Sequence, residues 1–275
     1  MNKNTISALI GLSITFVLGQ SAGEWEELTA GMERGVFYTQ QLTEGRNDSS
    51  WAINVIRIDP DYFELIFLDR SQTPNKDSKT AKNWSMEYGL AAVINGGMFE
   101  PDQITHTGYC KDGNHINNDQ WREYESIAAF APKNTMDASF QIFDRDRISS
   151  LDNIFNSYNG VVQNLRLIKR SRENRWPQQE RIWSEAALGE DSIGRILFIF
   201  SRFPYSMHDF NNILLNLPID IVSAQHLDGG PPAQLYVNAG GNEIELIGTY
   251  ETDHFEKWVN TKAWEIVSGQ SKCTT

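Results

Sequence analysis

Two short segments place a polar side chain directly before a pair of glycines, at the end of an apolar run. They are Asn95–Gly97, after LAAVI, and Asp228–Gly230, after IDIVSAQHL. Glycines let backbone N–H groups approach a ligand closely, and a carboxylate at a strand end suits a reaction in which charge changes. Both segments are also ordinary turn sequences, because Asn-Gly and Asp-Gly are common in tight hairpins. Each segment therefore has a structural and a functional interpretation.

The residues before the second glycine pair add a titratable neighbour. Side chains alternate along a strand, so His226 and Asp228 are expected to point to the same face.

A third candidate is a basic run inside an acidic chain. The net charge of the whole chain is −12. Residues 165–181 nevertheless carry six basic residues against two acidic ones: Arg166, Lys169, Arg170, Arg172, Arg175 and Arg181 against Glu173 and Glu180. The planar guanidinium groups could hold a phosphodiester, although a charge run more often marks a solvated face. Arg181 differs from the others because it opens an apolar stretch and could point into a cleft.

The order of these motifs along the chain resembles the phosphodiester glycosidase family. INGGMF is followed by NGVVQNLRLI, then by the segment from Arg181 to Arg195 that contains WSEAALGED, and then by HLDGG. The resemblance covers roughly residues 50–250, and four motifs in one order are more specific than any one of them. It implies hydrolysis of a sugar phosphodiester. No cofactor is expected, and no metal site is expected because the five His residues form no HxH or HExxH pattern.

The resemblance also implies site residues. The expected catalytic residues are Asp228, Arg181, Glu185 and His226, and the expected substrate-binding residues are Asn95, Gly96, Gly97, Phe99, Gln163, Asn164, Gly229 and Gly230. Three positions depart from the family's common pattern. Pro231-Pro232-Ala233 stands where many members have a glycine and a serine, and Glu185 and His226 are unusual at their positions. Substrate choice is therefore expected to differ.

The implied reaction breaks the bond between the sugar C1 and the phosphate oxygen. A phosphomonoester is a good leaving group because its second pKa is about 6, so the demand for a general acid is low. Arg181 is expected to hold the phosphate, Asp228 to stabilise the sugar cation or act as nucleophile or base, and Glu185 and His226 to move protons. Two alternatives remain open: a metal-dependent phosphoesterase that cuts the P–O bond, and a non-catalytic saccharide-binding protein of the cell envelope.

The N-terminus predicts export. Lys3 precedes an apolar stretch from about Ile6 to Leu18, and small residues follow, which is the layout of a signal peptide over residues 1–22. The stretch is short for a membrane span, so no stable membrane insertion is expected after its removal. We expect a periplasmic or secreted protein. The negative charge disfavours nucleic acid as a partner.

Cysteine and histidine usage is less informative. Cys110 and Cys273 could form a disulfide after export or remain unpaired thiols. His106, Cys110, Asp112 and His115 lie close together along the chain, but their spacing matches no zinc motif.

The hydrophobic pattern predicts one α+β domain over residues 23–275, with a mixed, mostly antiparallel sheet and few helices. Trp51–Asp59 and Tyr62–Asp69 are expected to pair as a hairpin, and residues 100–125 to form a long polar loop. A helix is expected from Thr80 to Tyr88, ended by Gly89, and another from Ser206 to Leu217, ended by Pro218. A terminal hairpin is expected around Gly240 and Gly241. The remaining strands are expected over SIAAFAP, SFQIFD, GVVQNLRLI, EAALG and RILFIFS.

Overall fold

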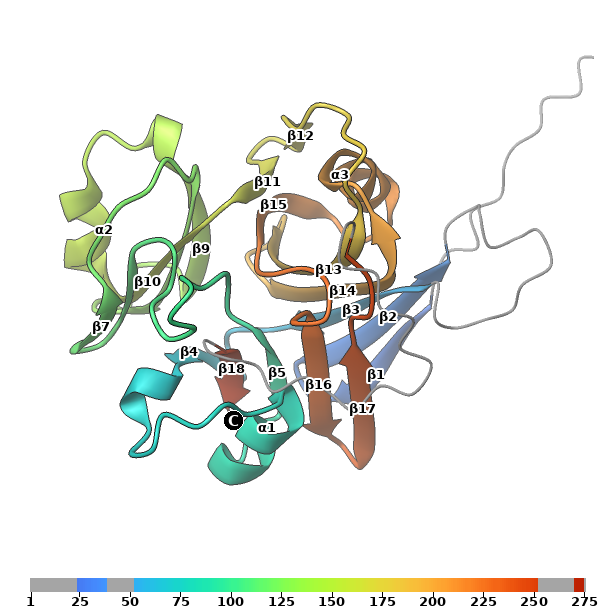
Figure 1. Cartoon of the computed structure of the whole chain (residues 1–275), viewed down its shortest axis with the longest axis horizontal. Coiled ribbons are helices and arrows are strands. Elements are labelled where there is room, and N and C mark those ends of the chain that lie inside the picture. The colour runs from blue at the N-terminus through green and yellow to red at the C-terminus, as the bar shows by residue number, and fades with distance from the viewer. Residues whose placement is uncertain (1–23, 39–51, 252–269, 275) are drawn as a thin grey trace, which may run out of the picture.

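The computed structural model describes residues 24–38, 52–251 and 270–274, the last of these without their side chains. The predicted signal peptide, residues 1–22, lies outside the described residues, and so does the side chain of Cys273. Strands dominate and α-helices are few, which confirms the α+β class (Figure 1). The strands form three antiparallel sheets rather than one. Among the described residues, no helix has the length and apolar character needed to cross a membrane.

The largest sheet has eight strands in the order β1-β2-β3-β14-β13-β15-β11-β12. Their bounds are β1 Trp25–Thr29, β2 Met32–Tyr38, β3 Ala52–Ile58, β14 Ile196–Tyr205, β13 Trp183–Asp191, β15 Ile221–His226, β11 Arg166–Lys169 and β12 Glu173–Asn174. The central strands β3, β13 and β14 are almost entirely buried, because the sheet is covered on both faces by apolar clusters. β3 and β14 are largely apolar, whereas β13 also buries Ser184, Glu185, Glu190 and Asp191.

The other two sheets have five strands each, in the orders β7-β6-β10-β8-β9 and β17-β16-β5-β18-β4. The first contains β6 Cys110–Asp112, β7 His115–Asn118, β8 Ser126–Pro132, β9 Phe140–Asp144 and β10 Tyr158–Asn164. The second contains β4 Glu64–Leu68, β5 Ala92–Asn95, β16 Gln234–Ala239, β17 Asn242–Ile247 and β18 Gln270–Thr274. The hairpin of β16 and β17 around Gly240 and Gly241 was predicted and is confirmed.

Among the described residues, two of the three α-helices follow their predicted signals. Helix α1 (Ala81–Tyr88) begins where the Thr80 hydroxyl accepts a hydrogen bond from the Asn83 N–H at 3.1 Å, and it ends at Gly89, whose φ is 66°. Helix α3 (Met207–Asn216) is capped by Ser206 and buries Met207, Phe210 and Leu214 on one face. Helix α2 (Leu151–Ser157) was not predicted.

Some predictions are wrong. Ala52–Ile58 and Glu64–Leu68 are both strands, but they lie in different sheets: β3 pairs with β2 and β14, and β4 pairs with β18. Both edges of β3 are occupied, so no hairpin with β4 can form. The loop predicted over 100–125 contains the short hairpin β6–β7. The single strand predicted over GVVQNLRLI is divided between β10 and β11, which belong to different sheets.

Candidate active site

Hydrogen bonds bring together the ends of one strand from each sheet. β5 ends at Asn95, whose side chain bonds to Asp228, two residues after the end of β15 at His226. β10 ends at Asn164, whose side chain bonds to Gly96. The chain then crosses from β15 to β16 through the second glycine pair. In the register of β5 and β16, Ile94 lies opposite Leu235. Asn95 is therefore level with Gln234, where the crossing segment enters β16.

The side chain of Asn95 ties the two glycine junctions together. Its Nδ2 donates a hydrogen bond to the carbonyl oxygen of Asp228 at 3.3 Å, and its Oδ1 accepts one from the N–H of Gln234 at 3.0 Å. Asn95 is buried, so both bonds replace contacts with water. The amide thus closes the loop from Asp228 to Gln234 and fixes the first junction beside the second.

The carboxyl group of Asp228 has a raised pKa. Its Oδ1 accepts a hydrogen bond from the N–H of Gly229 at 2.9 Å. Burial of the carboxyl raises the pKa of Asp228 to about 7, against the opposing effects of His226 and the Gly229 N–H. The negative charges of Glu251 and Glu185 add to the rise. A carboxyl with this pKa can release and accept a proton near neutral pH.

Glu185 and His226 form a buried ion pair beside Asp228. Ala187 of β13 lies opposite His226 of β15, so Glu185 is its diagonal neighbour on the same face. Oε1 of Glu185 contacts Nδ1 of His226. Both side chains are almost fully buried, at 1% and 5% exposure. Burial lowers the pKa of His226, but the Glu185 charge and hydrogen bond raise it more, so the net change is upward.

Trp183 completes this group from the start of β13. Its Nε1 donates to Oε2 of Glu185, so both oxygens of that carboxylate are held. The indole packs directly on Gly229: a Cβ atom there would lie 2.1 Å from Cδ1 of Trp183. The first glycine of the Asp-Gly-Gly segment is therefore required by this close approach, and the second has a φ of 67°.

Gly96 and Gly97, the first glycine pair, lie against the side chains of Asn164 and His106. Asn164 donates from Nδ2 to the carbonyl oxygen of Gly96 at 3.3 Å. A Cβ atom on Gly97 would lie 2.3 Å from Nε2 of His106 and 2.7 Å from Oδ1 of Asn164. Within the described part of the chain, neither of these two buried atoms has a hydrogen-bond partner. Burial lowers the pKa of His106 to about 4.

Phe99 and Gln163, two other predicted substrate-binding residues, have their contacts within the protein. Phe99 packs edge-on against the ring of His106, with 5.4 Å between ring centroids. Gln163 is buried, and its amide is used within the protein: Nε2 donates to the carbonyl oxygens of Arg122 and Tyr124, and Oε1 accepts from the N–H of Arg122. Its contacts hold the segment before β8.

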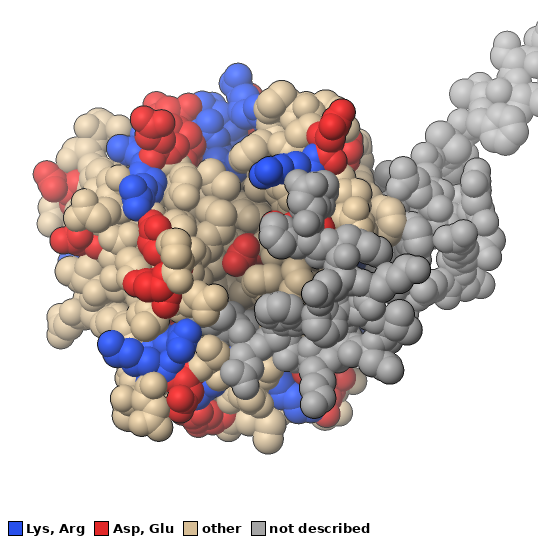
Figure 2. Space-filling model, viewed as in Figure 1, with Lys and Arg blue, Asp and Glu red and all other residues tan. Residues whose placement is uncertain are grey.

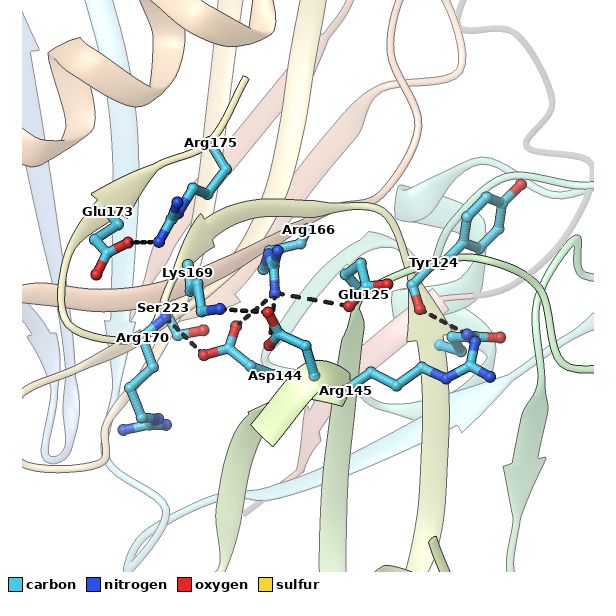
Figure 3. Close-up of polar contacts among 12 residues, drawn as sticks. Tyr124, Glu125, Asp144, Arg145, Arg166, Lys169, Arg170, Glu173, Arg175 and Ser223 are labelled. Carbon is cyan, nitrogen blue, oxygen red and sulfur yellow. Dashed lines mark hydrogen bonds and ion pairs between the residues drawn. The ribbon is translucent and has the colours of Figure 1, made fainter. Parts of the chain in front are cut away.

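The basic run is balanced by carboxylates. Figure 3 shows Arg166 directed toward Asp144 and Glu125, with which it forms ion pairs at 3.4 and 3.9 Å. The further ion pairs of the run are Arg166 with Asp146, Lys169 with Asp146, Arg170 with Glu190 and Arg175 with Glu173. The pairs of Arg166 and Lys169 connect β11 with carboxylates in or next to β8 and β9, and Arg170 donates to the carbonyl oxygen of Ile142 in β9. This part of the run therefore acts in packing two sheets. Arg181 is exposed and lies before β13 begins.

The loop with His106, Cys110, Asp112 and His115 does not gather a set of ligands. His115 contacts Asp69 at 2.9 Å, and Asp112 accepts from the N–H of Phe67 at 2.8 Å. Cys110 is a buried free thiol. In the described ranges no group of three or more His, Cys, Asp or Glu is placed to hold a metal ion.

The structure therefore brings together Asn95, the two glycine pairs, Asn164, Glu185, His226 and Asp228, and it leaves Arg181 exposed. Trp183 and Glu251 were not predicted as site residues, and His106 was considered only as a metal ligand. Trp183 lies two residues before Glu185, a period-2 spacing that could have indicated a shared strand face. The face of the molecule seen in Figure 2 is hollowed near its middle, and acidic side chains show there.

Comparisons with known proteins identify the family of the chain. The model of the phosphodiester glycosidase family matches residues 88–262, and the chain belongs to this family. The matched range contains both glycine pairs, Glu185 and His226.

Solved structures show the same fold. The catalytic domain of zebrafish N-acetylglucosamine-1-phosphodiester alpha-N-acetylglucosaminidase, auto-inhibited by its pro-peptide, is similar with a TM-score of 0.62 and 14% identity, over 90% of this chain and 86% of that one. A hypothetical protein from Synechocystis is similar with a TM-score of 0.61 and 13% identity, over 91% of this chain and 63% of that one. No curated protein sequence matches the chain.

Proposed function

We propose that this chain is an exported hydrolase that cleaves the glycosidic C1–O bond of a sugar-1-phosphodiester and releases the sugar and a phosphomonoester. Membership of the phosphodiester glycosidase family supports the reaction class. The observation that carries the proposal is the position of the Asp228 carboxyl, with its pKa of about 7, at the second glycine junction, which Asn95 ties to the first. Carboxyl groups whose pKa is raised by burial are characteristic of acid–base sites.

The proposed reaction needs one base and one good leaving group. A water molecule forms a bond from its oxygen to C1, and its proton passes to the carboxylate of Asp228. The C1–O bond to the phosphate breaks, and its electron pair leaves on the phosphate oxygen. Because a phosphomonoester has a second pKa of about 6, it can depart without a proton from a general acid. Asp228 later returns its proton to solvent.

The glycine segments and their neighbours would bind the substrate. Gly96 and Gly97 would offer their backbone N–H groups to the substrate, because glycine allows close approach of the main chain. The N–H groups of Gly229 and Gly230 already donate to Asp228 Oδ1 and to the carbonyl oxygen of Ser184, so these two glycines would shape the segment that carries Asp228. Asn95 acts indirectly, because its amide already binds the backbone at Asp228 and Gln234. Asn164 would position Gly96 in the same way. Arg181 has no role in this proposal, since it lies exposed outside the group.

The experiment is a screen of synthetic sugar-1-phosphodiesters in ¹⁸O-labelled water, using chain that lacks residues 1–22. Label in the released sugar is the expected result, and label in the phosphate would mean P–O cleavage by a phosphoesterase. Asp228→Asn is expected to lower turnover by roughly 100-fold or more, whereas Asp77→Asn at an exposed position should not. Saturable binding without turnover would instead indicate a saccharide-binding protein.

Export is tested separately. We propose that residues 1–22 are removed and that the protein acts in a periplasm or outside the cell. The N-terminal sequence of protein recovered from the exported fraction should begin near residue 23. Retention of the full chain in the cytoplasm would contradict this part of the proposal.

A further inference from the structure

The charges around Asp228 are unfavourable for an anionic substrate, with one exception. Among the described residues, the charged side chains that act on the Asp228 carboxyl are His226, Glu251 and Glu185. Glu251 lies next to the second glycine pair, with a carboxylate oxygen 3.1 Å from the position of a Cβ on Gly230. Two of the three neighbours are thus carboxylates, and a phosphodiester carries one further negative charge. Only a protonated His226 offsets them.

The basic run does not supply the missing charge. Arg166, Lys169 and Arg170 are ion-paired with Asp144, Asp146 and Glu190, at the contact between two sheets. Arg172 donates to the carbonyl oxygens of Ile221 and Leu215. These guanidinium and ammonium groups already have their partners.

We infer that the imidazolium of His226, oriented by Glu185, is the group that binds the phosphate of the anionic substrate. This inference rests on the proposed function and names the residue that recognises its substrate class. Contact of Nδ1 with the Glu185 carboxylate leaves Nε2 as the ring nitrogen that donates to a ligand. Glu185 is a positioning residue, because its other oxygen is held by Trp183 and it touches the ligand only through His226.

Burial and charge support a protonated ring. His226 faces Glu185 from β13 and Asp228 from its own segment, and Glu251 lies beyond Asp228. The carboxylate partner raises the pKa of His226 despite burial. A neutral imidazole would leave Glu185 as a buried, unpaired charge, which is costly.

The test measures anion binding apart from turnover. Dimethyl phosphate is a suitable probe because it is a phosphodiester, has no sugar and keeps one negative charge at every pH used. Binding is followed by NMR titration of histidine ring signals, in an Asp228→Asn background. That background removes both turnover and the titration of the neighbouring carboxyl, so the remaining pH dependence belongs to His226.

The expected results are specific to each variant. Affinity for dimethyl phosphate should fall as pH rises through the His226 pKa. His226→Gln should weaken binding roughly 10- to 100-fold at pH 6 and abolish its pH dependence, because a hydrogen bond to a charged group contributes about this much. Glu185→Gln should move the midpoint of the His226 titration and of anion binding to lower pH. A role in packing alone would move neither midpoint.

Two matched controls separate site effects from folding effects. His208→Gln changes the same residue type on α3, and Glu190→Gln changes a buried glutamate at the other end of β13. Both should bind the probe like the background protein. Binding that is independent of pH, or equal in His226→Gln and His208→Gln, or absent from the background protein, would overturn the inference. The unsubstituted chain could still hydrolyse sugar phosphodiesters in that case. Failure of the His226 inference is therefore distinguishable from failure of the proposed function.

Discussion

The amide of Asn95 joins segments that lie 133 positions apart in the chain, because its Nδ2 donates to the carbonyl oxygen of Asp228 at 3.3 Å. The same side chain accepts from the N–H of Gln234 at 3.0 Å. A single buried side chain therefore sets the path of the segment that carries the candidate catalytic carboxyl. The Asn95 side chain positions this segment, so its loss should lower both the stability of the protein and its turnover.

Asn95→Ala should destabilise the protein by about 2–3 kcal/mol, since it leaves two buried backbone groups without partners. Turnover should fall as well, because the segment from Asp228 to Gln234 loses its anchor. Denaturant unfolding and initial rates measure the two effects. Asn238→Ala, an exposed position on β16, is the control. Equal stability of the two variants would show that the Asn95 amide is not a structural anchor.

The Asp228 carboxyl should lower stability as pH rises. Its pKa is raised to about 7 in the folded chain, so the folded state holds the proton more tightly than the unfolded state does. Stability from this group is present below the unfolded pKa of about 3.9 and is lost as pH rises toward 7. Relative to the unsubstituted chain, Asp228→Asn should therefore gain about 4 kcal/mol of stability between pH 4 and pH 8, because the shift is about three pKa units. Melting temperatures over this range measure it, and a difference that does not change with pH would contradict the raised pKa.

Gly229→Ala tests the contact with Trp183. An added Cβ would lie 2.1 Å from the indole, so either the ring or the Asp228 segment must move. Movement of the ring would remove a hydrogen bond from Glu185. We expect a loss of stability of about 1–3 kcal/mol and at least a tenfold fall in turnover. Gly113→Ala is the control, because no heavy atom lies within 4 Å of its added Cβ and it is remote from the site. It should lose some stability, through its φ of 57°, but no activity.

Arg170→Gln tests the interpretation of the basic run as a packing element. The substitution leaves the Glu190 carboxylate, which is 8% exposed, without its ion-pair partner. Burial already raises the pKa of Glu190, so loss of the cation should raise it further. Stability should fall by about 2 kcal/mol, whereas KM should not change. Arg175→Gln breaks an exposed pair with Glu173 and should have little effect on stability. A large rise in KM for Arg170→Gln would restore the phosphate-binding interpretation of the run.

Local features of the sequence predicted several segments that decide their own structure, although α2 and the β6–β7 hairpin were missed. The hydroxyl of Thr80 and the left-handed Gly89 delimit α1, and Ser206 caps α3, because helix ends are fixed by neighbouring residues. The same holds for the hairpin of β16 and β17, whose two turn glycines adopt positive φ. The fold class and the importance of the two glycine pairs followed from such signals and from the order of the motifs.

Pairings between distant strands were not encoded locally. Residues 52–58 and 64–68 are adjacent in sequence and both form strands, yet β3 uses both of its edges for β2 and β14. A hairpin was the natural prediction for two runs separated by a turn. The choice between partners depends on the whole set of apolar faces to be buried, which no short segment contains.

The sequence by itself determined that Asp228 follows an apolar strand and precedes two glycines, and that the chain resembles phosphodiester glycosidases. The tertiary structure decided which groups surround that carboxyl. It pairs β13 with β15, which puts Glu185 against His226, and it leaves Arg181 exposed. The reason is physical: alternation along one strand fixes which face a side chain takes, but only the register between two strands fixes which side chains meet on that face.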